Sequence, residues 1–363
     1  MTNPIFKQIT IIGLGLIGSS IARGVRKNNL AERIIAYDQD ELSLTYAIKE
    51  KFIDEAANNI GESVSDSELV IIATPPATLA DISKEIATSL SDRTIVIDVA
   101  SVKRPAISAI EDNLPQNVIF MPTHPIAGSE RTGVRSGRDD LFKQRRIIIT
   151  PEQPPEDELL NKLTNFWGAM GARLEGMPAD THDLIYAYMS HLPQLIAFCV
   201  TEPLGEFYKR ELEDPQQNNI YKTFLRITSS DSELWADIFA QNSENLLKGL
   251  DRYIDAIAYV QRELQTAPKS EESKADEVIA YTRLFPRIVA SCLITTVMEA
   301  EKNTGISFAK YAGTGFADFT TPALLPPDED TESISAQYKQ VEKILDAFLL
   351  RLKQFRHALV SRQ

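Results

Sequence analysis

Cysteine and histidine are scarce in this chain of 363 residues, which has two cysteines and four histidines. Two cysteines cannot form the disulfide framework of a small secreted domain, and Cys199 and Cys292 both lie in apolar runs typical of buried, reduced thiols. We therefore expect no disulfide and no metal site. The cytoplasm is the expected location.

Long apolar runs and an excess of positive charge are also missing. Apolar stretches such as RIVASCLITTVM, residues 287–298, are shorter than the roughly 20 residues of a membrane span. The chain starts without a basic segment and cleavage site of a signal peptide. A net charge of −13 repels the phosphates of nucleic acids. We expect a protein with neither membrane nor nucleic-acid partners, and an anionic substrate would need a locally basic site.

The first 40 residues contain the signature of a dinucleotide-binding domain. A β-branched run at residues 9–12 is followed by Gly13, Gly15 and Gly18 in the spacing GxGxxG, and then by a helical pattern. The first glycine would permit a tight turn, the second a close approach of pyrophosphate, and the third packing of the helix on the strand. The turn also includes Leu16 and Ile17, so the pyrophosphate would lie at the amino end of that helix.

Asp38 closes the next predicted strand, about 20 residues after the glycines. A carboxylate there accepts hydrogen bonds from a ribose 2′-hydroxyl and repels a 2′-phosphate, so NAD is favoured over NADP. An alternative is that Asp38 only starts a turn. Further strands end at Thr74 and Pro75 and at Ser101, which should face the cofactor because ligands bind at the carboxyl ends of parallel strands.

His124 follows another predicted strand and precedes a proline, in the segment PTHPIAGSE. At this edge it lies near the expected nicotinamide position. An imidazole, with a pKa of about 6.5, suits a general base at neutral pH, and a rigid loop would hold it ready for substrate. The alternative is a structural histidine that caps a turn.

The motifs GLGLIG, ATPP, DVASVK, HPIAGSE and SHLP occur in this order, and the chain resembles the prephenate/arogenate dehydrogenase family of tyrosine biosynthesis over about residues 8–250. The resemblance implies NAD-dependent oxidative decarboxylation of prephenate or arogenate to 4-hydroxyphenylpyruvate or tyrosine. It also implies that His124 accepts the proton of the ring hydroxyl, and that Ser101 assists that hydroxyl and orients His124.

The second half of the chain has helical periodicity. We predict an α/β Rossmann-type dinucleotide-binding domain at residues 1–176 and an all-α dimerisation and substrate domain at 177–363, with the substrate between them and a homodimer formed through the helices. A long helix, or two helices with a kink near Pro193, should follow residue 178.

The resemblance implies that four residues of the helical domain bind the small anionic substrate. They are Ser190, His191, Gln194 and Arg226. For His191 the alternatives are contact with the nicotinamide side of the cleft and helix packing beside Pro193. Gln194 stands where the family has a histidine, which leaves the choice between prephenate and arogenate open. Arg226 suits the ring carboxylate, although the glycine-rich start of its motif is missing; alternatively it is a surface charge paired with Asp231. Two roles remain possible for His182: a site residue, or part of a His-Asp cap at a helix start.

Lys103 and Arg131 are weaker candidates for contact with the anion, since most such residues are solvated. Two rival functions remain. A β-hydroxyacid dehydrogenase or imine reductase would not depend on His124, and a non-catalytic NAD-binding regulatory protein would bind the cofactor without turnover.

Residues 266–363 are a candidate divergent repeat or extension. LFPRIVASC echoes SHLPQLIAFC, with Pro286 matching Pro193 and Cys292 matching Cys199. Phe319 lies as far after Pro286 as Arg226 does after Pro193. Either the helical module is duplicated, or two amphipathic helices are similar by chance.

Overall fold

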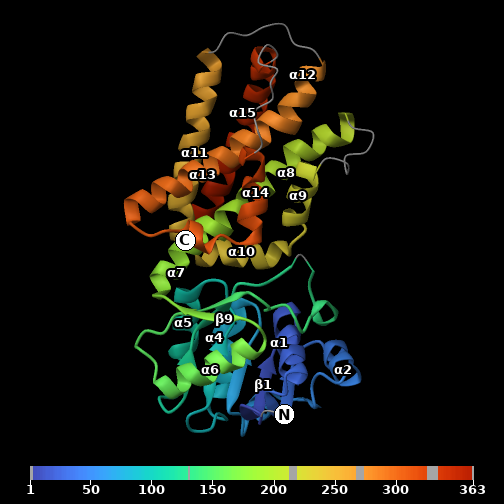
Figure 1. The fold of residues 1–363 in the computed structure, drawn as a ribbon, viewed down its shortest axis with the longest axis vertical. Coiled ribbons are helices and arrows are strands. Elements are labelled where there is room, and N and C mark those ends of the chain that lie inside the picture. The colour runs from blue at the N-terminus through green and yellow to red at the C-terminus, as the bar shows by residue number, and fades with distance from the viewer. Residues whose placement is uncertain (1–2, 130, 212–218, 267–273, 325–333, 362–363) are drawn as a thin grey trace. The chain divides into compact units, whose positions relative to one another are not determined.

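The computed structural model describes residues 3–129, 131–211, 219–266, 274–324 and 334–361. The chain divides into two compact units (Figure 1). The α/β unit comprises Met1–Asp183 and Asp231–Gln241, and the helical unit comprises Leu184–Ser230 and Asn242–Gln363. The predicted fold class, a Rossmann-type domain followed by a helical domain, is confirmed.

A six-stranded parallel sheet in the order β3-β2-β1-β4-β5-β6 forms the centre of the α/β unit. Its strands are β1 (Phe6–Ile12), β2 (Ala31–Tyr37), β3 (Glu55–Ala56), β4 (Leu69–Ile72), β5 (Ile95–Asp98) and β6 (Ile119–Met121). Strand order reverses between β1 and β4, and such a switch point is where ligands bind in open α/β sheets. The sheet thus puts the glycine-rich turn after β1 at the expected binding edge.

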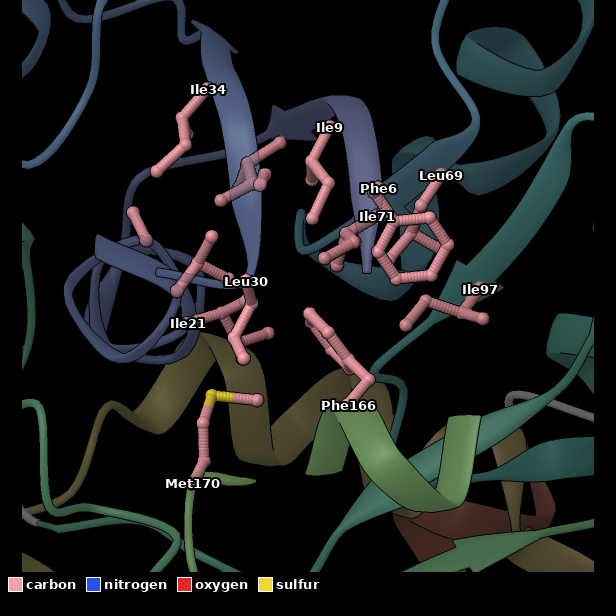
Figure 2. Packing of buried hydrophobic residues seen from close by; sticks show 14 of the residues in the cluster. Phe6, Ile9, Ile21, Leu30, Ile34, Leu69, Ile71, Ile97, Phe166 and Met170 are labelled. Carbon is pink, nitrogen blue, oxygen red and sulfur yellow. The ribbon is translucent and has the colours of Figure 1, made fainter. Parts of the chain in front are cut away.

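Helices on both faces bury the sheet. They are α1 (Leu16–Lys27), α2 (Glu41–Lys49), α3 (Ile60–Val64), α4 (Leu79–Ala87), α5 (Lys103–Glu111) and α6 (Asp157–Ala169). Figure 2 shows one core, in which Phe166 of α6 approaches Phe6 of β1, and Met170, directly after α6, lies beside Leu30. A second buried cluster, with Ile12, covers the opposite face. Every residue of β4 and β5 is buried, which explains why both strands are apolar except for Asp98, the last residue of β5.

A second, three-stranded sheet carries His124. It consists of β7 (Thr123–Pro125), β8 (Arg146–Ile149) and β9 (Arg173–Gly176), in the order β7-β8-β9. His124 is in register with Ile148 of the antiparallel β8. His124 follows the parallel strand β6, as predicted, but the expected loop is wrong, because His124 lies in a short strand. Backbone pairing, rather than the following proline alone, fixes the residue.

The helical unit begins inside α7 (Ala179–Tyr186). It continues with the π-helical turn η3 (Ala187–His191), α8 (Leu192–Glu211), α9 (Asn219–Thr228), α11 (Ser243–Thr266), α12 (Lys274–Ile279), the π-helical turn η5 (Ala280–Leu284), α13 (Phe285–Thr304), α14 (Thr314–Leu324) and α15 (Ile334–Val360). α10 (Ser232–Gln241) belongs to the α/β unit. The irregularity predicted near Pro193 is this first π-helical turn, because proline lacks the amide of a regular helix.

Two helical stretches are long and apolar enough to span a membrane by length and composition alone, at Ala179–Thr201 and Asp276–Thr304. The expectation that the apolar run at 287–298 is too short is therefore wrong, because the helix extends well beyond it. Core helices of water-soluble proteins pass the same test, and 78% of the apolar window of the first stretch is buried inside the protein, against 39% for the second.

Candidate active site

Each of the three glycines in the turn after β1 is required, or suited to its position, for a different structural reason. Gly13 has a φ of +95°, a backbone conformation that favours glycine. A Cβ on Gly18 would lie 1.9 Å from the Gly13 carbonyl oxygen, so only glycine permits this packing of α1 on the strand. A Cβ on Gly15 would meet no atom within 4 Å, which leaves open space for a phosphate group.

Leu16 and Ile17 form the first turn of α1, which carries no acidic residue. The exposed amide groups and dipole at this helix end therefore favour an anion. Thr74 and Pro75 follow β4 at the neighbouring strand end, where the Thr78 hydroxyl donates to the Thr74 hydroxyl at 2.9 Å. This end of the α/β unit fits the pyrophosphate of a dinucleotide.

Asp38 lies directly after β2 and links it to the glycine-rich turn. Its carboxylate accepts hydrogen bonds from the backbone N–H groups of Leu14 and Asp40. These bonds hold a negative charge at the position where a ribose hydroxyl of NAD would lie, and where a 2′-phosphate would be repelled.

Replacing Asp38 by asparagine should lower the preference for NAD over NADP. The amide keeps an acceptor for Leu14 but removes the charge, and a charge-assisted hydrogen bond contributes about 1.5–3 kcal/mol. We expect the ratio of kcat/KM with NAD to that with NADP to fall roughly tenfold or more. Asp40→Asn is the matched control, and an unchanged ratio in Asp38→Asn would contradict the assignment.

A basic hollow of about 740 Å³ adjoins the glycine-rich turn. Its lining includes Leu16, the Asp140 carboxylate, which pairs with Arg138, and five cationic side chains, of Arg131, Arg135, Arg138, Lys143 and Arg145. In a chain with a net charge of −13, this concentration of cations creates a local field that attracts phosphates or carboxylates. Arg131 thus lies where a contact with an anion is sterically open.

His124 belongs to a chain of hydrogen bonds that sequence reasoning did not assemble. Its Nδ1 lies 2.8 Å from Nε2 of His182, whose Nδ1 lies 2.8 Å from a carboxylate oxygen of Asp183. A carboxylate only accepts, so neutral His182 carries its proton on Nδ1 and accepts from His124 at Nε2. His124 then carries its own proton on Nδ1, which makes its Nε2 the basic nitrogen.

Asp183 is itself fixed by the start of α5. Its two carboxylate oxygens accept the backbone N–H groups of Lys103 at 2.7 Å and Arg104 at 2.8 Å. His182 has no exposed surface and Asp183 is 3% exposed. Asp183 therefore caps α5, while its neighbour His182 contacts His124. The adjacent His-Asp sequence was the only local signal for this arrangement. A role of His182 in the reaction stays a prediction.

Lys103 is neither a solvated charge nor open to a substrate anion, so both predictions for it are wrong. The side chain is fully buried, and its ammonium group donates to the Asp98 carboxylate and to the Thr123 carbonyl. Asp98 also accepts the backbone N–H of Thr123 at 3.0 Å. Burial lowers the pKa of Lys103, and the nearby Asp98 carboxylate opposes that shift. This ion pair anchors β5 to the residue before His124.

Ser101 lies half-buried after β5, two residues before Lys103. The ring contact that orients His124 comes from His182, with ring centroids 5.0 Å apart. The role of Ser101 beside the substrate hydroxyl stays a prediction.

Three predicted residues lie around η3 in the helical unit. His191 is 1% exposed, and its Nδ1 lies 3.1 Å from the Asn242 side-chain amide, a partner that the sequence did not indicate. Ser190 is half-buried beside it. Gln194 donates its amide to the Ile227 carbonyl at 2.8 Å, so it ties α8 to the helix that carries Arg226. π-Helical turns often occur at functional sites.

Arg226 is half-exposed and forms an ion pair with Asp318 of α14. The alternative partner considered from the sequence, Asp231, instead accepts the backbone N–H groups of Glu233 and Leu234 at the start of α10. Asp318 belongs to the segment AGTGFADF, which resembles the glycine-rich start missing before Arg226. Two distant segments thus meet at this arginine.

The two cysteines are free and buried. Burial raises the pKa of both Cys199 and Cys292 to about 12, so neither is a reactive thiolate. Among the residues that the structure describes, no group of three or more His, Cys, Asp or Glu side chains could hold a metal ion.

Comparisons with known proteins agree over both units. Residues 21–176 match the family model described as prephenate dehydrogenase, nucleotide-binding domain. The model described as prephenate dehydrogenase, dimerization domain, matches twice, at residues 178–272 and 271–363.

Individual relatives cover most of the chain. A cyclohexadienyl dehydrogenase of Zymomonas mobilis is 30% identical over 270 residues, which are 74% of this chain and 90% of that protein. A prephenate dehydrogenase of Bacillus subtilis is 30% identical over 272 residues, 72% of each chain. The structure of prephenate dehydrogenase from A. aeolicus in complex with hydroxyphenyl propionate and NAD+ superposes with a TM-score of 0.63 at 27% identity, covering 72% of this chain and 92% of that one.

Proposed function

The chain belongs to the prephenate dehydrogenase family, and from this premise we infer that it catalyses the NAD-dependent oxidative decarboxylation of prephenate, arogenate or both. The substrate is a cyclohexadienol with a ring carboxylate. NAD, when bound, takes the hydride from the carbinol carbon. The ring carboxylate leaves as carbon dioxide, and its bonding electrons make the ring aromatic. The products serve tyrosine biosynthesis.

The observation that carries the proposal is the hydrogen-bond chain from Asp183 through His182 to His124. A carbinol releases hydride readily only as its O–H proton is removed, so the reaction needs a base at that oxygen. Nε2 of His124 is proposed to accept this proton. The Nδ1–H of His124 then donates to His182, which stabilises the imidazolium as it forms. Because two buried groups, His182 and Asp183, fix the ring, the base is oriented before substrate arrives.

Arg226 is proposed to bind the ring carboxylate. A guanidinium can pair with a carboxylate through two parallel hydrogen bonds. The Arg226 side chain is half-exposed, so a ligand can approach it. Ser190 and His191 are proposed to contact the substrate from η3. Gln194 also stays a proposed contact, although its bond to Ile227 supports a second role in holding the arginine helix.

Replacing His182 by phenylalanine should lower kcat about 10- to 150-fold. The loss reflects a hydrogen bond to a group that becomes charged, about 1.5–3 kcal/mol. The acidic limb of the kcat profile should move to lower pH, because imidazolium formation at His124 loses its acceptor. His182→Gln restores an acceptor and should recover part of kcat. A structural role alone would leave the pH profile in place.

The choice of substrate is tested by initial rates of NADH formation with prephenate and arogenate in parallel, with identification of the aromatic product. Turnover of either supports the proposal. Turnover only of short hydroxy acids or cyclic imines would favour the reductase-type rival, and NAD binding without turnover would favour a regulatory protein.

The matched dimerization model supports pairing of this helical domain with another of its kind. The sequence-based prediction that the pairing joins two chains, as well as the cytoplasmic location, stays a prediction.

A further inference from the structure

The helical unit contains two copies of one module. The π-helical turns Ala187–His191 and Ala280–Leu284 lie 93 residues apart, and each is followed by a helix with proline at its second position, Pro193 or Pro286. Buried residues recur at the same spacing along α8 and α13: Leu192/Phe285, Ile196/Val289, Ala197/Ala290, Cys199/Cys292, Val200/Leu293 and Leu204/Val297. A π-helical turn is rare, so its repetition at one position argues against chance.

The closing helices of the modules repeat at a spacing of 95 residues. In α11 and α15 the buried pairs are Leu246/Val341, Leu250/Leu345, Tyr253/Phe348, Ile254/Leu349 and Ile257/Leu352. The same spacing relates Phe224 to Phe319 in α9 and α14. The match of Phe319 to Arg226 in the sequence was therefore two residues off, and Thr321 is the counterpart of Arg226.

The modules contact each other reciprocally. Asp251 pairs with Arg356, and Gln261 donates to Asp346. Asp346 is the counterpart of Asp251 and Arg356 is the counterpart of Gln261, so each module offers the same two positions to the other. Residues that contact their own counterparts lie where a two-fold axis would pass, and Phe224–Phe319 and Tyr253–Phe348 do so with ring centroids 5.3 and 6.2 Å apart.

This reciprocity is the defining property of a two-fold symmetric subunit interface. The long helices also pack chiefly across it: α11 against α15 and α13, and α8 against α15 (Figure 1). Contacts of α8 with α11, and of α13 with α15, are fewer. Although α8 packs on α9 and α13 on α14 within a module, the four long helices are covered chiefly by the other module, so each module depends on the other for much of its core.

The second module has lost the predicted site residues. At the positions of His191, Gln194 and Arg226 it has Leu284, Arg287 and Thr321. It retains the glycine-rich segment that places Asp318 beside Arg226. The modules have therefore diverged. The first module keeps the predicted substrate-binding side chains, and the second contributes Asp318 beside Arg226.

We infer that residues 274–360 act as a built-in partner, occupying the place that a second subunit's helical domain would fill. One chain with one active site is then the functional unit, in place of the homodimer predicted from the sequence. Two successive matches to a dimerization-domain model agree with this arrangement. The pairing is independent of the reaction, whereas the count of active sites rests on the proposed function.

The mass in solution tests the pairing directly. Sedimentation equilibrium of the full chain between about 0.1 and 50 µM should give the chain mass of 40.5 kDa throughout. A stable species of twice that mass would overturn the inference.

Cross-linking tests which chain supplies the second module. In Gln261→Cys/Asp346→Cys, a short bis-maleimide should join the two positions, while the native cysteines are buried. In an equal mixture of ¹⁴N and ¹⁵N chains, the linked peptides should be all-light or all-heavy. Hybrid peptides would mean that the modules pair between chains. Gln261→Cys alone is the control and should give no link.

Activity tests the single site. Specific activity should not change on dilution over the same concentrations, and NAD should bind once per 40.5 kDa. Activity that falls on dilution together with the mass would overturn the inference. An inactive monomer that still cross-links within the chain would leave the pairing intact and count against the proposed function instead.

Discussion

Replacing His124 by asparagine is expected to lower kcat by about 10²- to 10⁴-fold, the usual contribution of a general base. Asparagine can still donate a hydrogen bond toward His182, but it cannot accept a proton. Because the residue lies on β7, held by pairing with β8, the substitution should leave the fold and the Kd of NAD within about twofold. Stopped-flow measurement of NADH formation separates the chemical step from product release.

His357→Asn provides the matched control, since His357 is exposed near the end of α15. It should retain full kcat. A His124→Asn variant with kcat within tenfold of the wild type would remove His124 from the role of base and strengthen the β-hydroxyacid dehydrogenase alternative.

Replacing Lys103 by methionine is expected to lower the free energy of unfolding of the α/β unit by about 3–5 kcal/mol. The change leaves Asp98, which has no exposed surface, as an uncompensated buried charge. It also removes the donor to the Thr123 carbonyl, next to His124. Activity at low temperature should fall as β7 loses this anchor.

Urea unfolding followed by tryptophan fluorescence suits this measurement, because Trp167 and Trp235 are the only two tryptophans and both belong to the α/β unit. Lys143→Met, at an exposed position, should change the free energy of unfolding by less than about 0.5 kcal/mol. Equal effects of the two substitutions would show that the Asp98–Lys103 pair does not stabilise the fold.

The nucleotide-binding turn was predictable because its signal is local. Gly13, Gly15 and Gly18 are required by backbone conformation and by close approaches near the turn. The strand before them is marked by a short run of mostly β-branched residues. The position of Asp38 follows from the length of one strand–helix–strand unit. Such features depend on spacing alone.

The hydrogen-bond chain behind His124 was not predictable in the same way. His182 lies 58 residues away and reaches His124 because α7 and β7 meet in the fold. Lys103 reads as an ordinary surface cation in the sequence SVK, and only the carboxylate and carbonyl around it reveal a buried ion pair. The three-stranded sheet was missed because its strands have only three or four residues.

The repeat in the helical unit was visible in the similar segments around Pro193 and Pro286. The spacing between matching residues, however, is not constant along the chain. Compared with the first module, the second has two additional residues between Val297 of α13 and Phe319 of α14, which shift the spacing from 93 to 95. Contacts between counterparts, such as Phe224 and Phe319, fix the alignment that sequence similarity left open.

The most direct test of the proposed reaction is the stoichiometry of carbon dioxide and NADH released from prephenate or arogenate by the wild-type chain. Oxidative decarboxylation predicts one carbon dioxide per NADH throughout the time course. NADH without carbon dioxide, or neither product from a chain that binds NAD, would contradict it.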